Sequence, residues 1–309
     1  MDHVVLEEGL SSLGLTDLRR IVGGWQSVAV YDGRIDGEHV AVKVLDAQLA
    51  DRGALDARLK LLSQLATVTD RVCAPVPAGG RLVNDVAGDG VDPSYVVAYQ
   101  YAEGDAPDVD RPEDAEQMGR ILAELHASMA ALPAYRLPDL AAFPPPPKLV
   151  KVAEDLGVSI AGLADASPDH DGSPRQLLHG DYSSKNVRVA GTTWRVFDFD
   201  DCGYGPVELD VANSLYFVLF GAMTGGDRDV YRRFREGFVR GYRDRSGVAL
   251  TDPVLDRLIT RRVLALASWL ADPDTAPPGI RTASDEWRTT LGAFVQRHLE
   301  TVEDVPPVR

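Results

Sequence analysis

The hydrophobic pattern of the chain changes character near Gly104, and this change limits the folds that the chain can adopt. Before Gly104, the runs 28–31, 40–45 and 95–99 are rich in apolar residues and end at turn residues, which is typical of strands. One stretch, 51–66, instead repeats leucine at helical spacing. After Gly104 helical spacing dominates. We therefore predict an α+β fold with a small antiparallel-sheet domain over residues 1–104 and a larger, mainly helical domain over residues 105–309.

Turn and helix signals divide these domains further. The pairs Asp32–Gly33 and Asp36–Gly37 predict a turn region between the first two strands. Pro112, followed by acidic residues, predicts the start of a helix. A short β excursion over 186–198, with Gly191 at its turn, interrupts the helical domain. The remaining helices are predicted near 207–222, 227–244, 253–270 and 283–302.

Charge and cysteine content exclude several classes of protein. The formal net charge of −15 opposes binding to nucleic acid or to an anionic membrane, and it would attract cationic small molecules. Cys73 and Cys202 lie too far apart in the sequence to form a CxxC pair, so we expect two ordinary buried thiols. The apolar run 211–223 contains Asn213 and is shorter than the ~20 residues of a membrane span. With no secretory pattern near Met1, the prediction is a cytoplasmic protein.

The segment 179–186, with the sequence HGDYSSKN, carries the most chemical information. Phosphoryl transfer needs a carboxylate that accepts or orients the proton of the attacking hydroxyl, and hard oxygen ligands that hold Mg²⁺ against the nucleotide phosphates. Asp181 could do the first task. Asn186 and Asp198 could do the second, because the hairpin between them returns the chain on itself.

The run H-G-D-x-x-x-x-N, followed by D-F-D, resembles the catalytic segment of the aminoglycoside phosphotransferase family, the small-molecule branch of the protein-kinase-like fold. The resemblance implies a bilobal protein-kinase-like fold in which Asp181 is the catalytic Asp. It also implies that Asn186 and Asp198 hold Mg²⁺, and that His179 and Asp210 brace the catalytic loop without reacting.

The first domain offers residues that could bind a nucleotide. Lys43 lies in a strand-like run with Ala41 on the same face, so a small side chain could pack on adenine while the ammonium group reaches phosphate. The alternative is an edge-strand lysine that faces water. Upstream, Gly24 and Ser27 resemble the family's nucleotide loop, although two glycines before a strand usually indicate only a turn. Gln100 and Ala102 resemble the hinge whose backbone meets adenine, the alternative being a plain interdomain strand.

Two features depart from the related kinases. The strand lysine of this fold normally pairs with a Glu on the following helix, but that helix offers only Asp51 and Asp56, and Arg58 stands where the Glu is expected. Asp56 could substitute, the helical register could differ, or another group could hold Lys43. In addition, Gly180 replaces the Arg of protein kinases and no long activation segment follows, so regulation by phosphorylation of that segment is not expected.

These observations predict a small-molecule kinase that uses ATP or GTP with Mg²⁺. The predicted acceptor is a hydroxyl on an amine-bearing, cationic metabolite or antibiotic, because the chain is acidic and the variable stretch 137–175 adds carboxylates near the site. Asp201, which follows the metal-binding segment, is the best candidate for contact with the acceptor. The alternatives are a kinase of Ser or Thr in a peptide during natural-product biosynthesis, and a nucleotide-binding pseudokinase.

Overall fold

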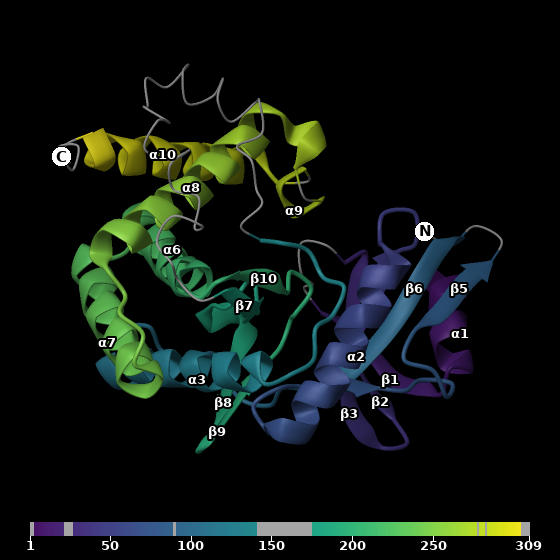
Figure 1. Cartoon of the computed structure of the whole chain (residues 1–309). Helices are drawn as coiled ribbons and strands as arrows, with labels where there is room; N and C mark the ends of the chain where they lie inside the picture. The colour runs from purple at the N-terminus through teal and green to yellow at the C-terminus, as the bar shows by residue number, and fades with distance from the viewer. Residues whose placement is uncertain are drawn as a thin grey trace. The chain divides into compact units, whose positions relative to one another are not determined.

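The computed structural model describes residues 3–21, 27–88, 91–140, 175–276, 278–281 and 283–303. The chain forms two compact units (Figure 1). The first unit contains residues 1–105, 132–137 and 188–197, and the second contains residues 106–131, 138–187 and 198–309. Gly24 and residues 141–174 of the variable acidic stretch lie outside the described residues.

The first unit contains a six-stranded antiparallel sheet, which confirms the predicted antiparallel sheet. The strand order is β1-β2-β3-β6-β4, and β5 also pairs with β6. Strand β3 is therefore paired on both sides. The elements are α1 (His3–Ser12), β1 (Leu15–Ile21), β2 (Ala29–Ile35), β3 (Glu38–Asp46), α2 (Arg52–Val68), β4 (Pro75–Val76), β5 (Asn84–Gly88) and β6 (Val91–Gln100).

Each face of the sheet is covered by one helix (Figure 1). Because side chains alternate along a strand, Val42 and Val44 of β3 face one way and Leu45 faces the other. The valines share a buried cluster with Leu6 and Leu10 of α1. Leu45 shares a second cluster with residues of α2. Lys43 has the same strand parity as Leu45, so it belongs to the face that α2 covers.

The predicted turn between the first two strands is only partly right. Asp36 and Gly37 form the turn, with φ of 50° and 85°, the left-handed pair that a two-residue hairpin turn requires. Asp32 and Gly33, in contrast, lie inside β2, where Gly33 pairs with Val40 of β3. The tight turn needs only two residues, so the first Asp-Gly pair continues the strand.

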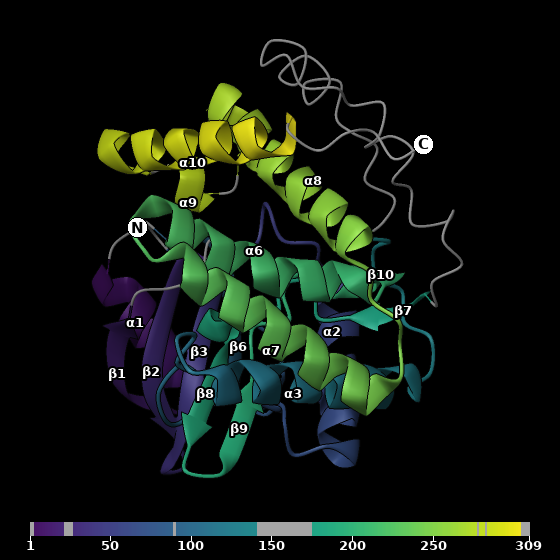
Figure 2. The same ribbon diagram turned by 90° about the vertical axis from the view of Figure 1, so that its left-hand side faces the viewer.

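The second unit contains the predicted helices. Helix α7 packs against α3 and α6, and α8 packs against α6 and α10 (Figure 2). Pro112 opens α3 with Glu113 and Asp114 in its first turn, where carboxylates favour the helix dipole. The elements are α3 (Pro112–Ala130), β7 (Arg175–Leu178), η2 (Ser184–Asn186), β10 (Gly203–Pro206), α6 (Glu208–Thr224), α7 (Arg228–Ser246), α8 (Asp252–Ala271), η3 (Pro273–Thr275), α9 (Pro278–Arg281) and α10 (Asp285–Glu303).

The predicted β excursion is a two-stranded hairpin of β8 (Val187–Ala190) and β9 (Thr193–Val196). Gly191 lies at its turn with φ of 61°. Asn186 directly precedes the first strand, and Asp198 comes shortly after the second. The predicted hairpin is therefore confirmed, and a metal site shared by Asn186 and Asp198 stays a prediction. Among the described residues, every helix is too short or too polar to cross a bilayer.

A buried histidine joins α8 to α10 and predicts a pH effect on stability. His298 is 7% exposed. The Thr260 hydroxyl donates its hydrogen to the Asp256 carbonyl oxygen. The same hydroxyl oxygen lies 3.1 Å from His298 Nε2 and can accept a hydrogen bond from the N–H at that position. Burial lowers the pKa of His298 to about 4, although the Asp256 charge opposes this shift.

Below the ordinary histidine pKa of ~6.5, the unfolded chain takes up a proton that the folded protein rejects. We therefore expect the free energy of unfolding to fall between about pH 6.5 and 4, by up to about 3 kcal/mol from this group. Urea unfolding of the protein and of His298→Gln across this range would measure the effect. An equal pH dependence in the two proteins would contradict this assignment.

Candidate functional site

The segment predicted to be catalytic follows β7 in the second unit. Strand β7 pairs with β10, and His179, Gly180 and Asp181 leave the end of β7. Gly180 has φ of 84°. A Cβ at Gly180 would lie 2.0 Å from the carbonyl oxygen of Asp201, so both the backbone angle and the available space require glycine. This contact explains why the Arg of protein kinases is absent at this position.

We expect Gly180→Ala to destabilise the protein and displace the loop. Gly191→Ala is the matched control, because Gly191 also has positive φ, but a Cβ added there would have no heavy atom within 4 Å. The control should cost about 1 kcal/mol, the usual penalty for a left-handed residue with a side chain. Gly180→Ala should cost about 1–3 kcal/mol more because the backbone must also move. Chemical denaturation of both variants would test this difference, and equal losses would contradict the steric argument.

Asp181 is half-buried and is held through both carboxylate oxygens. The Asn186 side-chain amide donates to Oδ2 at 3.0 Å and to the Asp181 carbonyl oxygen at 2.8 Å. Asn213 of α6 donates to Oδ1 at 3.3 Å, and Arg262 of α8 donates to the same atom at 3.2 Å. These contacts fix the orientation of the carboxylate, which a group that receives or orients a substrate proton requires.

Asp210 supports the backbone of the same loop. Its carboxylate is fully buried and accepts hydrogen bonds from the backbone N–H groups of His179 and Gly180, each at 2.8 Å. His126 of α3 lies 3.0 Å from it through Nε2. Burial alone would raise the pKa of Asp210, but the hydrogen bond and charge of His126 outweigh burial and hold that pKa below its ordinary value. Asp210 is therefore placed to stabilise the loop as an anion.

His126 is itself positioned by Tyr242 of α7. The Tyr242 hydroxyl lies 2.9 Å from His126 Nδ1. Burial, together with the charges of Asp210 and Glu208, raises the pKa of Tyr242, so its hydroxyl stays protonated and shares a hydrogen bond with His126. The consequence is a continuous chain of polar contacts from α7 through α3 to the loop of His179 and Gly180.

The predicted supporting residue His179 is fully buried and packs against aromatic rings. Its ring centroid lies 4.3 Å from that of Phe199 and 5.9 Å from that of Tyr182. Its Nδ1 accepts the backbone N–H of Asp181 at 3.2 Å. These contacts are those of a positioning residue.

The chemistry of Asn186 and Asp198 fits a magnesium ion. Because the Asn186 side-chain NH₂ group donates to Asp181, its oxygen is the atom that can bind a cation. Asp198 is half-buried and has φ of 67°, a backbone conformation that non-glycine residues adopt mainly at turns and functional sites. Within the described ranges, no cluster of three or more His, Cys, Asp or Glu side chains could hold a metal. Mg²⁺ commonly binds to one or two protein oxygens and completes its shell with phosphate and water.

The alternative of an edge-strand lysine is wrong, because β3 is a central strand and Lys43 is only 9% exposed. Its ammonium group lies 5.8 Å from the Tyr99 ring centroid.

Both acids of the α2 region have other contacts: Asp51 caps the helix, and Asp56 pairs with Arg52 at 3.4 Å. The leucine register of α2 is as predicted, and the buried Nε of Arg58 has no hydrogen-bond partner among the described residues.

The other predicted nucleotide contacts also lie in the first unit, while Asp201 lies in the second. Ser27 directly precedes the start of the β2 pairing, where Val28 donates to the Val44 carbonyl oxygen. Gln100 ends β6, and its backbone N–H already donates to the Ala74 carbonyl oxygen at 2.9 Å. A contact from Gln100 to adenine would therefore have to use its carbonyl oxygen. Asp201 is exposed in the second unit.

Three polar residues around Asp181 and its loop were not predicted as site residues. They are His126, Asn213 and Arg262. The first two could have been suspected, because each is a polar residue inside the apolar stripe of a helix. Arg262 gives no comparable signal, since it is one of two adjacent arginines in α8.

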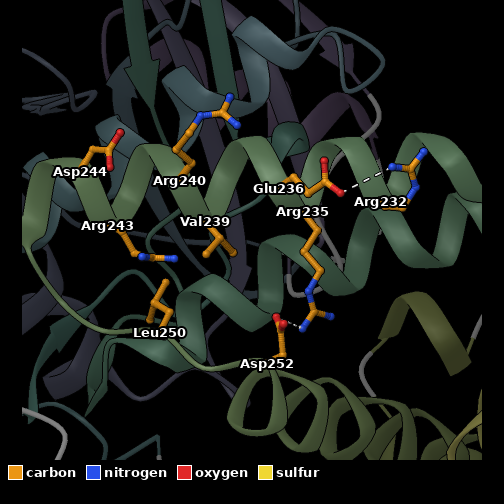
Figure 3. A pocket seen from close by; sticks show the side chains of 9 residues that line it. All are labelled: Arg232, Arg235, Glu236, Val239, Arg240, Arg243, Asp244, Leu250 and Asp252. Carbon is orange, nitrogen blue, oxygen red and sulfur yellow. Dashed lines mark hydrogen bonds and ion pairs between the residues drawn. The ribbon is translucent and has the colours of Figure 1, made fainter.

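A surface cavity of about 600 Å³ lies along α7 and contains none of the predicted site residues (Figure 3). Its arginines are largely neutralised by acidic neighbours. Arg235 lies 2.8 Å from Asp252, and Arg232 lies 3.5 Å from Glu236. The cavity therefore gives no reason to move the candidate site away from Asp181.

Comparison with known proteins gives a family and a fold. The family model described as "Phosphotransferase enzyme family" matches residues 17–257. No curated protein matches by sequence. Similar solved structures include an amicoumacin kinase in complex with AMP-PNP, Ca²⁺ and Ami, at 17% identity and a TM-score of 0.74, with 97% of this chain and 94% of that chain covered.

A microcompartment-associated aminopropanol kinase is 22% identical with a TM-score of 0.74, and the match covers 98% of this chain and 97% of that chain. A spectinomycin phosphotransferase in complex with ADP and spectinomycin is 14% identical with a TM-score of 0.62, and the match covers 97% and 98%. These likenesses confirm the predicted α+β, protein-kinase-like fold class.

Proposed function

The chain belongs to the phosphotransferase enzyme family, and from this premise we propose that it transfers the γ-phosphoryl group of ATP, with Mg²⁺, to a hydroxyl of a small molecule. Membership of this family favours an active enzyme over a nucleotide-binding pseudokinase. It also favours a small-molecule acceptor over Ser or Thr in a peptide. The predicted cytoplasmic setting would supply both ATP and Mg²⁺.

The observation that carries this proposal is the fixed carboxylate of Asp181. Both of its oxygens are held by side chains, and the loop that presents it is held by a buried anion. In the proposed reaction, Asp181 orients the acceptor hydroxyl and receives its proton as the new oxygen–phosphorus bond forms, while the bond from the γ-phosphorus to the bridging oxygen breaks and ADP leaves. His179 and Asp210 position this loop.

Asn186 and Asp198 are the proposed magnesium ligands. The ion would neutralise charge on the nucleotide phosphates during transfer. Asn186 would then have two roles, because its NH₂ group already holds Asp181 and its oxygen would bind the ion.

The first unit supplies the proposed nucleotide contacts. Lys43 would bind phosphate, and the backbone near Gly24 and Ser27 would approach it closely. The carbonyl oxygen of Gln100 and the N–H of Ala102 would meet the base. ATP is preferred over GTP in this proposal, since AMP-PNP and ADP are the nucleotides named for the similar structures.

The proposed acceptor carries an amine as well as the hydroxyl. The net charge of −15 favours a cation, and Asp201 is exposed near the loop for such a contact. An aminopropanol kinase and an amicoumacin kinase among the similar structures support a metabolite or an antibiotic as the acceptor class.

A substrate screen with mass detection tests this function. The full-length protein with Mg²⁺ and ATP would be offered amino alcohols, amino sugars, aminoglycosides and hydroxy amino acids. The expected result is a small-molecule product heavier by one phosphoryl group, together with equimolar ADP. Phosphorylation of Ser or Thr peptides, with no turnover of any small molecule, would refute the proposal.

A further inference from the structure

The side chain of Arg262 is the most informative group near Asp181 that the proposed reaction does not use. Only one of its nitrogens, Nη2, meets Asp181. Its other N–H donors have no hydrogen-bond partner among the described residues, and the side chain is 38% exposed. A guanidinium group has five N–H donors in a planar fork that suits a carboxylate. One edge of this fork is therefore available to a ligand.

Arg262 is held in place by aromatic rings as well as by Asp181. Its guanidinium carbon lies 5.2 Å from the ring centroid of Tyr216 and 5.3 Å from that of Phe217, both on α6. Such contacts favour a cation over the face of a ring and restrict the guanidinium plane. The group is therefore preorganised, so a ligand would bind without a large loss of side-chain entropy.

A second cation lies over the same Phe217 ring. Lys185, which is in the catalytic segment itself, places its ammonium group 5.1 Å from the ring centroid. Both cations therefore lie over the same ring of α6. The guanidinium group of Arg262 would attract an anionic group of a ligand and repel an amine placed directly against it.

We propose that Arg262 binds a carboxylate of the acceptor, so that the acceptor is a short hydroxy acid whose hydroxyl lies on Asp181. This inference rests on the proposed function and narrows its substrate class. An amine elsewhere on the same molecule is compatible with it, which would make the acceptor a hydroxy amino acid. Because Arg262 contacts Asp181 directly, the carboxylate and the reacting hydroxyl would be separated by only a few bonds.

Four small hydroxyl compounds distinguish the effect of the carboxylate from that of the amine. L-Homoserine carries carboxylate and amine, 4-hydroxybutyrate only the carboxylate, 3-aminopropan-1-ol only the amine, and propan-1-ol neither. Binding of each probe to the full-length protein would be measured by calorimetry or ligand-observed NMR. We expect both carboxylate probes to bind at least about 10-fold more tightly than the matched probe without a carboxylate.

Variants then assign this preference to Arg262. Arg262→Gln should weaken binding of the carboxylate probes by about 10- to 100-fold more than binding of the other two probes, since hydrogen bonds to charged groups are worth roughly this factor. Arg262→Lys should weaken binding of the carboxylate probes by an intermediate factor, because lysine keeps the positive charge but lacks the planar set of N–H donors. Arg240→Gln is the control: Arg240 of α7 pairs with Glu116 of α3 at 2.7 Å, and its loss should leave the binding of all four probes unchanged.

The inference fails if neither carboxylate probe binds, if the amine probe binds more tightly than 4-hydroxybutyrate, or if Arg262→Gln leaves carboxylate binding unchanged. Phosphoryl transfer is measured separately with Mg²⁺ and ATP. Carboxylate binding that depends on Arg262 without transfer to any hydroxyl would support this inference and count against the proposed function, so the two failures are distinguishable.

Discussion

Asp181→Asn should lower the turnover number by about 10²- to 10⁴-fold, the usual contribution of a positioned acid or base. Asparagine has nearly the same shape, but it cannot receive the hydroxyl proton, and it loses the charged partner of Arg262. The loop should remain folded, because Asp210 holds its backbone independently. Turnover with the best acceptor from the screen, together with binding of MgATP, would measure the effect. Nucleotide binding should change little.

Asp244→Asn is the matched control for this experiment. Asp244 is exposed on α7 and lines the surface cavity, away from the residues that hold Asp181. The control should retain the activity of the natural protein. Full activity in Asp181→Asn would remove Asp181 from the proposed chemistry.

Asp210→Ala should lower the free energy of unfolding by about 3–5 kcal/mol, the cost typical of removing one partner from a buried charged pair. The substitution leaves the N–H groups of His179 and Gly180, and the ring of His126, without their shared acceptor. Chemical denaturation would measure the loss, and turnover should fall with it because the loop carries Asp181.

The control and the pH dependence both sharpen this prediction. Asp229→Ala removes an exposed first-turn carboxylate of α7 and should cost less than about 1 kcal/mol. Because the pKa of Asp210 is lowered on folding, its stabilising contribution is present above the ordinary aspartate pKa of ~3.9 and is lost as the pH falls through the lower folded value. Equal losses in the two variants at neutral pH would contradict the role assigned to Asp210.

Local patterns in the sequence predicted most of the secondary structure. Helix α3 begins at the predicted Pro112, and the leucines that indicated α2 are buried. Strand β1 was not predicted, because its sequence, LTDLRRI, is mostly polar and has a register shift between Thr16 and Arg19. It is an outer strand that buries little, so it lacks the alternation from which a strand is recognised.

The contacts of the site could be predicted only where they are local in sequence. Asp181 and Asn186 lie five positions apart, and their hydrogen bonds follow from the turn of η2. Arg262 reaches Asp181 across 81 positions, and this contact depends on how α8 packs on α6. Helical spacing identifies the buried side of α8, but it does not specify the neighbour that a half-exposed arginine will meet.

The catalytic loop therefore has two supports that can change separately. Asp210 holds the main chain from the buried interior, whereas Arg262 holds the carboxylate of Asp181 from a partly exposed face of α8. Selection for a new acceptor could act on α8 while the loop keeps its conformation and its motif. Descendants of such a chain would share an unaltered HGD signature and yet differ in the molecules they modify, so the signature alone is a poor guide to the chemistry of any one of them.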